Sequence, residues 1–263
     1  MRINLHSSRL HLPTLPRWLA ACLLASCVIG SAMAADTEPH AALKRKINLP
    51  PSAELHYSIE ALQSGLQVNG EGLVKWRYGD NKYSVNSETR AMLIGKILET
   101  SSTGNIDGFG LAPLQFVEKR LRRDPSTTSF DRDAKSISFS QSQLSYPLLG
   151  GEQDRTSIIW QLIAVARGNA NKFSTNSEWL FFVAGPRDAQ QWSFKVIGRE
   201  KIQTERGNIN TVHLLRTPPA GDQGQKLDIW LAPESEWYPV RLRFSDPNGD
   251  FIEQTLDKIS KPG

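Results

Sequence analysis

The sequence has 263 residues, with 31 Lys and Arg against 27 Asp and Glu and only two cysteines. Both cysteines and three of the basic residues lie within the first thirty positions. Without that stretch the charges nearly balance, which argues against nucleic-acid binding, and no disulfide can form. The remaining chain is long enough to be stabilised by an apolar core alone.

Residues 1–35 have the order of a secretory signal peptide. A basic leader precedes an apolar run over residues 18–30, and Ala32-Met33-Ala34 offers a cleavage site. The run is shorter than the roughly 20 residues that span a bilayer, so we predict an exported, periplasmic protein without a transmembrane span in its mature chain. Residues 24–27 also resemble a lipobox, so an outer-membrane lipoprotein anchored through Cys27 is the alternative.

Residues 36–52 are aperiodic and end in Pro50-Pro51, which predicts a flexible lead-in. The chain then alternates between apolar and polar residues, as in half-buried strands. Turn signals such as Gly79-Asp80-Asn81 separate the alternating segments. About seven strands are expected before residue 150, over residues 55–62, 66–78, 82–90, 97–106, 113–122, 127–130 and 136–139.

Residues 154–167 are predicted to form the one amphipathic helix. Asp154 is the expected N-cap, and Gly168-Asn169 supplies a stop. Three polar residues, Arg155, Gln161 and Arg167, are expected to face outward, while the apolar positions recur at helical spacing: Ile158, Ile159, Leu162, Ile163 and Ala166.

Six further strands are expected after the helix, over residues 178–183, 191–198, 209–215, 226–231, 239–244 and 251–259. The pattern predicts a mainly β fold in which residues 53–263 form a single antiparallel domain, barrel-like or half-barrel, wrapped around one α-helix.

Several segments of the chain also carry a family likeness: Gly70-Glu71-Gly72, residues 83–89, 108–113, 153–157, 229–233 and 238–241. Through them the chain, from about Ala53 to Ile259, resembles the domain of unknown function 3108, a family of exported bacterial proteins. The resemblance implies an envelope location and a mostly antiparallel β fold round one helix, but no established activity. More loosely, the architecture is similar to the half-barrels that carry lipoproteins between bacterial membranes.

Catalytic and metal-binding motifs are missing from the sequence. His40, His56 and His213 have no partner at metal-ligand spacing, so neither a metal nor another cofactor is expected. We find no nucleophile elbow, zinc-protease motif or P-loop. The protein is therefore expected not to be an enzyme. An envelope hydrolase is the weakest alternative and would need a Ser or Asp/Glu constellation in one cleft.

The sharpest polar cluster is Gln153, Asp154 and Arg155 at the start of the helix. In a functional interpretation these residues contact a ligand at the mouth of a cavity, helped by the helix amides. In the simpler interpretation, which we favour, Asp154 caps the helix and Arg155 pairs with a strand carboxylate.

Tryptophans form the second group of candidates. Trp160, Trp192 and Trp230 could line a pocket for an apolar or sugar ligand. Aromatic residues on strands and helices more often fill the core, and we expect most of these to do so.

Residues 118–123 form the only dense basic run. Its cationic face could meet anionic lipid head groups or an acidic glycan. A solvated edge strand explains the run equally well, and we favour the edge.

Two functions follow from these features. The first is a non-catalytic binding or carrier protein for an apolar or lipid-like ligand, held in a cleft between the sheet and the helix. The second is a structural or assembly factor that acts through its surface on an envelope protein partner.

Overall fold

The computed structural model describes residues 40–204, 207–219 and 224–261. The predicted signal peptide and Cys27 lie outside these residues. None of the helices formed by the described residues combines the length and apolar character needed to cross a membrane.

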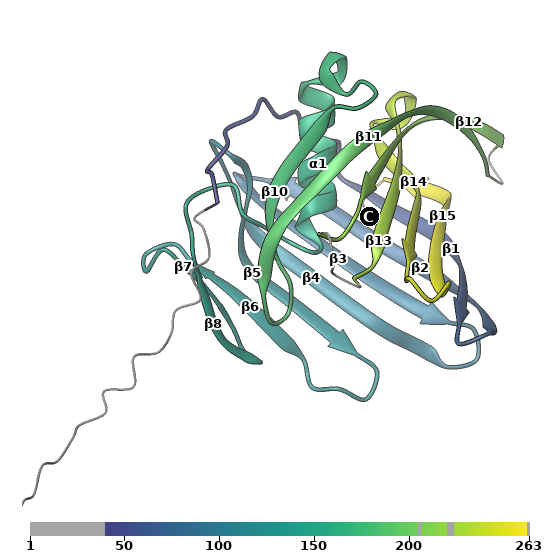
Figure 1. The fold of residues 1–263 in the computed structure, drawn as a ribbon, viewed down its shortest axis with the longest axis horizontal. Helices are drawn as coiled ribbons and strands as arrows, with labels where there is room; N and C mark the ends of the chain where they lie inside the picture. Colours follow the sequence, from purple (N-terminus) through teal and green to yellow (C-terminus); the bar gives the residue numbers. More distant parts are fainter. Residues whose placement is uncertain (1–39, 205–206, 220–223, 262–263) are drawn as a thin grey trace, which may run out of the picture. The chain divides into compact units, whose positions relative to one another are not determined.

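The described strands form one sheet of fifteen strands, and the predicted mainly β, barrel-like fold with one α-helix is confirmed (Figure 1). Strands β1 to β8 run back and forth as neighbours, and so do β10 to β15; β1 pairs with β15 and joins the two halves. The strands are β1 (Ala53–Gln63), β2 (Leu66–Gly79), β3 (Lys82–Ala91), β4 (Gly95–Asp107), β5 (Gly110–Arg120), β6 (Ser126–Asp131), β7 (Ser136–Phe139), β8 (Ser142–Pro147), β9 (Gln153–Asp154), β10 (Glu178–Ala184), β11 (Ala189–Thr204), β12 (Gly207–Arg216), β13 (Lys226–Ala232), β14 (Tyr238–Ser245) and β15 (Phe251–Ser260).

The strands differ from prediction at three places. Strand β8 occupies part of a predicted loop, because its polar residues pair with β7 at the border of the sheet instead of alternating with apolar ones. Strand β11 is about twice as long as expected. The basic run 118–123 is not an edge strand: β5 lies between β4 and β6, and its exposed cations reach solvent from the end of an interior strand.

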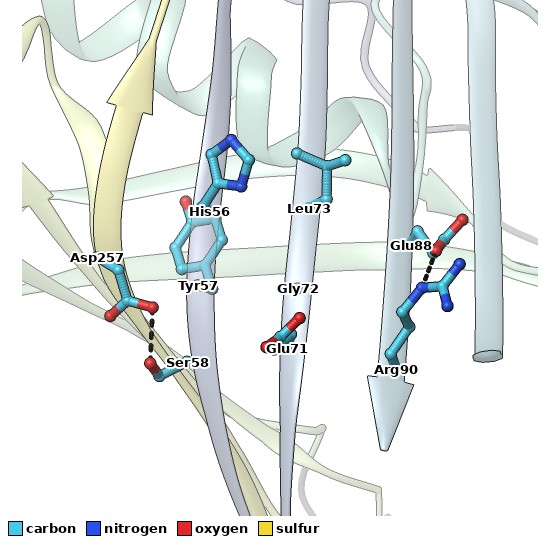
Figure 2. Close-up of a pocket in the computed structure, with 9 residues that line it drawn as sticks. All are labelled: His56, Tyr57, Ser58, Glu71, Gly72, Leu73, Glu88, Arg90 and Asp257. Carbon is cyan, nitrogen blue, oxygen red and sulfur yellow. Dashed lines mark hydrogen bonds and ion pairs between the residues drawn. The ribbon is translucent and has the colours of Figure 1, made fainter. Parts of the chain in front are cut away.

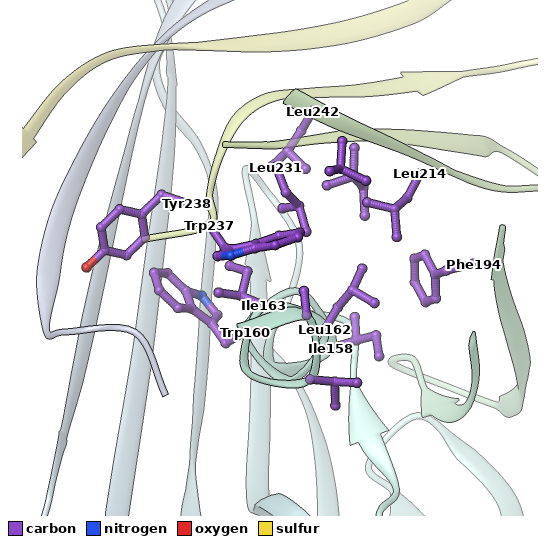
Figure 3. Packing of buried hydrophobic residues seen from close by; sticks show 14 of the residues in the cluster. Ile158, Trp160, Leu162, Ile163, Phe194, Leu214, Leu231, Trp237, Tyr238 and Leu242 are labelled. Carbon is purple, nitrogen blue, oxygen red and sulfur yellow. The ribbon is translucent and has the colours of Figure 1, made fainter. Parts of the chain in front are cut away.

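Helix α1 (Ser157–Gly168) packs against the sheet, and Figure 3 shows its apolar side chains surrounded by those of the strands. Ile158, Leu162 and Ile163 are each 0% exposed. Two short 3-10 helices, η1 (Ala170–Lys172) and η2 (Pro233–Ser235), complete the elements. The helix ends at Gly168 as predicted, but it begins at Ser157 with Thr156 as its N-cap, so Asp154 is not the N-cap residue.

The segment of residues 40–52 is not the flexible lead-in that the sequence predicts. It has no helix or strand, yet it packs along the domain, because its backbone groups find partners there. The Asn48 amide donates to the carbonyl of Ala164 at 2.9 Å, and the Trp76 indole donates to the carbonyl of Pro50 at 3.0 Å. Ile47 contacts the main core as well.

A substitution at Gly168 tests this packing. A Cβ added to Gly168 would lie 2.5 Å from the carbonyl oxygen of Lys46, a backbone atom that cannot rotate away. Gly168→Ala should therefore lower the free energy of unfolding by about 1–3 kcal/mol in urea denaturation. Gly79→Ala is the matched control, because a Cβ there meets no atom within 4 Å. Equal stability of the two variants would mean that the segment is not held against α1.

Candidate functional site

The face of the sheet that carries α1, here called the inner face, is covered only in part. Next to the helix its side chains are closed off: Leu55, Trp76 and Val85 are each 0% exposed. Residues that are paired across neighbouring antiparallel strands point to the same face of the sheet. Tyr57 is paired with Gly72, Gly72 with Thr89, and Thr89 with Leu98, so all four are inner-face positions farther along the same strands.

Beyond the start of α1 the inner face is covered less completely, although Ile59 and Ala91, which the register also places on it, are each 5% exposed. Thr100 marks the border, since its hydroxyl lies 3.0 Å from that of Thr156, the N-cap residue. Past it lies a mostly apolar set of half-buried side chains from five neighbouring strands, which we call the helix-free face: Ala61, Val68, Thr89, Leu98 and Ile252. None of the five belongs to the hydrophobic core clusters of the described chain. This surface is therefore open to a ligand where the rest of the inner face is not.

The predicted polar cluster at the helix start points into the protein. One carboxylate oxygen of Asp154 accepts from the amides of Thr156 and Ser157, both at 2.8 Å, and the other accepts from the Ser102 hydroxyl at 2.5 Å. Asp154 is 0% exposed. Burial raises the pKa of its carboxyl to about 6, although these hydrogen bonds oppose the rise. The carboxylate thus bonds the first-turn amides, as a cap does, from two residues before the N-cap.

Gln153 and its neighbour Glu152 also serve the chain itself. The Gln153 amide donates to the carbonyl of Leu111 at 2.7 Å, and Glu152 accepts from His40 at 2.7 Å. Burial would raise the pKa of Glu152, but the hydrogen bonds from His40 and from the amide of Gly150 outweigh it and lower the pKa. Both residues hold the loop before α1 in place, so neither is available to a ligand.

Gln161 does not face outward from the helix, although the sequence predicts that it does. It is 2% exposed, and its side chain accepts from the Leu111 amide at 2.9 Å and donates to the Phe109 carbonyl at 2.8 Å. Its position on the helix is opposite the apolar residues. The backbone groups at and just before the start of β5 face this side of the helix, and the Gln161 side chain forms hydrogen bonds with them.

Arg155 is the one member of the predicted cluster that reaches solvent. Its side chain is 41% exposed and lies 4.0 Å from the Asp188 carboxylate, which belongs to the turn between β10 and β11 and not to a strand. Its guanidinium also lies over Gly185 of the same turn, so the side chain is directed to the β10–β11 turn.

The three candidate tryptophans have different surroundings. Trp160 is buried and stacks on Trp76, with ring centroids 4.7 Å apart, so it belongs to the core. Trp192 is 8% exposed and lies under the guanidinium of Arg216 at 4.4 Å. Trp230 is half-buried on the opposite, outer face, where it stacks on His213 at 4.4 Å. The three therefore do not line one pocket.

A hollow of about 380 Å³ lies on the outer face across β15, β1, β2 and β3, and none of the six predicted site residues lines it (Figure 2). Ser58 donates to Asp257 at 2.6 Å, and Arg90 pairs with Glu88 at 2.5 Å. His56 lies nearby, but Ser58 bonds the carboxylate directly, so the order of a serine–histidine–acid triad is not present in this hollow. Among the described residues no cluster of His, Asp or Glu suits a metal ion.

The comparisons with solved structures concern the fold. The crystal structure of a β-barrel-like protein of domain of unknown function DUF1849 from Brucella abortus is 12% identical, with a TM-score of 0.52 over 84% of this chain and 100% of that one. The lipoprotein LppX of Mycobacterium tuberculosis is 12% identical over 80% of this chain and 87% of its own, with a TM-score of 0.27. The DUF1329 family protein of Desulfovibrio piger is 9% identical over 81% and 86%, also with a TM-score of 0.27.

None of the curated proteins compared with the sequence matches it. A family model does match: that of the proteins of unknown function DUF3108, over residues 53–257. This range covers the whole sheet except residues 258–260 at the end of β15, and it includes α1, the helix-free face and the hollow on the outer face. The chain belongs to the DUF3108 family.

Proposed function

We propose that the protein is a non-catalytic binding protein of the cell envelope, and that its ligand is apolar or lipid-like and lies on the helix-free face. The observation that carries the proposal is the change in burial along the inner face, from 0% exposure at Val85 beside α1 to the half-buried Thr89 and Leu98 farther along. Half-buried apolar side chains on a concave face are the usual lining of an apolar ligand site.

We propose a ligand site beside the start of the helix, in place of the cleft between sheet and helix that the sequence suggests. Leu162 and Ile163 fill the latter space, and the surrounding side chains of β10 to β14 contact them in one continuous core (Figure 3). The helix-free face borders the first turn of α1, where the hydroxyl of Thr156 meets that of Thr100.

A matched pair of leucines tests this placement. Leu98 lies on the helix-free face, whereas Leu73 is half-buried on the outer face and lines the hollow there. Leu98→Lys should weaken binding of a fluorescent fatty-acid analogue about tenfold or more, because a charge would be placed against the apolar chain. Leu73→Lys should leave the affinity unchanged.

The assay is a fluorescence titration, and thermal denaturation of each variant shows that it is folded. Failure of the wild-type protein to bind any apolar probe, or equal loss in the two variants, would refute the proposed site.

The envelope location rests on the N-terminal leader alone, which lies outside the described residues. We infer an exported mature chain beginning near Ala35. The mass of the mature protein, with or without a lipid on Cys27, distinguishes a periplasmic protein from an outer-membrane lipoprotein.

A further inference from the structure

The turn between β3 and β4 presents an unusual apolar tip. Met92, Leu93 and Ile94 are 69%, 104% and 62% exposed, so three consecutive large apolar side chains stand in solvent. A fourth, Leu66, is 69% exposed at the start of β2, the strand next to β3. Isolated exposed leucines are common on protein surfaces, but a contiguous apolar group of this kind marks a contact surface.

The backbone holds this tip in a defined position. The Met92 amide donates to the Asn69 carbonyl of β2 at 3.0 Å, and the Ile94 amide donates to the Ala91 carbonyl at 3.2 Å. Gly95 has a φ of 85°, which turns the chain back into β4. The apolar side chains are thus displayed by an ordered hairpin end.

A basic turn lies next to the tip. The Leu121 amide donates to the Ile97 carbonyl at 2.9 Å, which places the turn between β5 and β6 beside the first residues of β4. Leu121 is itself 45% exposed. Figure 1 shows the hairpin ends of β1–β2, β3–β4 and β5–β6 following one another along one border of the blue and teal strands.

The cations of this basic turn are unpaired. Arg122 and Arg123 of the turn and Lys119, at the end of β5 before it, are exposed, and none of them has an ion-pair partner within 4.0 Å among residues 40–204, 207–219 and 224–261. Lys119 lies opposite Glu99 of β4 in the strand register. Arg120 pairs with Glu118 at 2.6 Å, and Asp124 is the turn's own acidic residue. Each free cation near an anionic lipid surface strengthens binding about fivefold.

We propose that the apolar tip (Met92, Leu93 and Ile94) and the basic turn (Lys119, Arg122 and Arg123) together dock the protein on an anionic phospholipid membrane. The tip inserts among the acyl chains at the interface, and the cations contact the phosphates of the head groups. Apolar side chains flanked by free cations match the two layers of such a surface, whereas a protein partner would have to supply both an apolar pocket and a carboxylate cluster. The surface shares no residue with the proposed ligand site, although Thr89 and Leu98 lie on the same β3–β4 hairpin. The docking variants leave these two residues unchanged, so the two proposals can fail separately.

Sedimentation with vesicles tests the docking. Protein made from the full chain is recovered in the form that the cell produces, and its N-terminus is determined by mass spectrometry. The probes are vesicles of phosphatidylglycerol mixed with phosphatidylethanolamine and vesicles of phosphatidylcholine alone. Wild-type protein should bind the anionic vesicles preferentially, and added salt should weaken the binding.

Two variants should lose this binding by different routes. Replacing Met92, Leu93 and Ile94 by Ser should lower the partition coefficient at least tenfold on both kinds of vesicle. Arg122→Glu with Arg123→Glu should lower it at least tenfold on anionic vesicles only. The controls are Leu114→Ser, which changes an exposed leucine elsewhere, and Lys82→Glu with Arg199→Glu, which reverses two exposed cations on β3 and β11.

A fluorescent label gives a local readout. The only cysteines, Cys22 and Cys27, lie in the predicted leader, so Leu93→Cys can be labelled singly in a cleaved, unlipidated chain. Its fluorescence should shift to the blue on anionic vesicles, and that of Leu114→Cys should not. The proposal is overturned if the serine variant binds vesicles as wild type does. It is also overturned if the label at residue 93 stays in water while a photo-cross-linker at that position captures a protein.

Discussion

Leu162→Ala should lower the free energy of unfolding by about 2–5 kcal/mol. Leu162 is 0% exposed in the middle of α1, and its side chain packs in the core that the strands form around the helix (Figure 3). Truncation removes buried methyl groups and leaves a cavity that the sheet cannot close, since β12 and β13 are held by their own hydrogen bonds. Urea denaturation monitored by circular dichroism measures the loss.

The matched control is Leu114→Ala on β5, where the side chain is 42% exposed. That change should stay within about 0.5 kcal/mol of wild type. If the two variants are equally stable, α1 is not part of the core, and the assignment of the open surface beyond it fails as well.

Asp154→Asn should remove a stability change of about 3 kcal/mol between pH 3 and pH 7. The carboxyl is buried and its pKa is raised from 3.8 to about 6, so the folded protein binds its proton more tightly than the unfolded chain does. The stability that the protonated Asp154 carboxyl contributes is fully present below its pKa in the unfolded chain. It is lost as the pH rises through its pKa in the folded protein. Asparagine carries no titrating proton and can still accept from the amides of Thr156 and Ser157.

The measurement is urea denaturation of both proteins across this pH range, taken as the difference between them. Taking the difference is necessary because Glu152 works in the opposite direction: its lowered pKa means that its contribution is lost as the pH falls. A difference that does not depend on pH would show that Asp154 is ionised alike in the folded and unfolded states.

Much of the fold could be predicted because its causes are local. The alternation of apolar and polar residues along β1 to β4, and the helical spacing of Ile158, Leu162 and Ile163, follow from which face of each element is buried. The turn at Asp80 and Asn81 was equally readable, and both residues adopt the positive φ that such hairpins require.

The candidate site was less predictable because its causes are not local. The sequence predicts Asp154 as a helix cap, Gln153 as a possible ligand contact and Gln161 as a solvent-facing residue. In the structure they bond Ser102, Leu111 and Phe109, which belong to strands β4 and β5 and the turn between them. Their partners are known only once the helix is placed across those strands.

The helix-free face depends on geometry that no single segment carries. Leu98 and Leu73 both lie in strands where apolar and polar residues alternate. Only the pairing register shows that Leu98 is on the inner face and Leu73 on the outer face. Whether the inner one is covered then depends on where α1 begins. The exposure of Met92, Leu93 and Ile94 likewise follows from the position of their hairpin end in the sheet, which the local sequence does not give.

Native mass spectrometry of the protein purified from the cells that make it tests the central proposal most directly. Wild-type protein and the Leu73→Lys variant should carry an apolar molecule as added mass, and the Leu98→Lys variant should be recovered without it. If wild-type protein is found empty, or if Leu98→Lys retains the same added mass, the helix-free face does not hold the ligand.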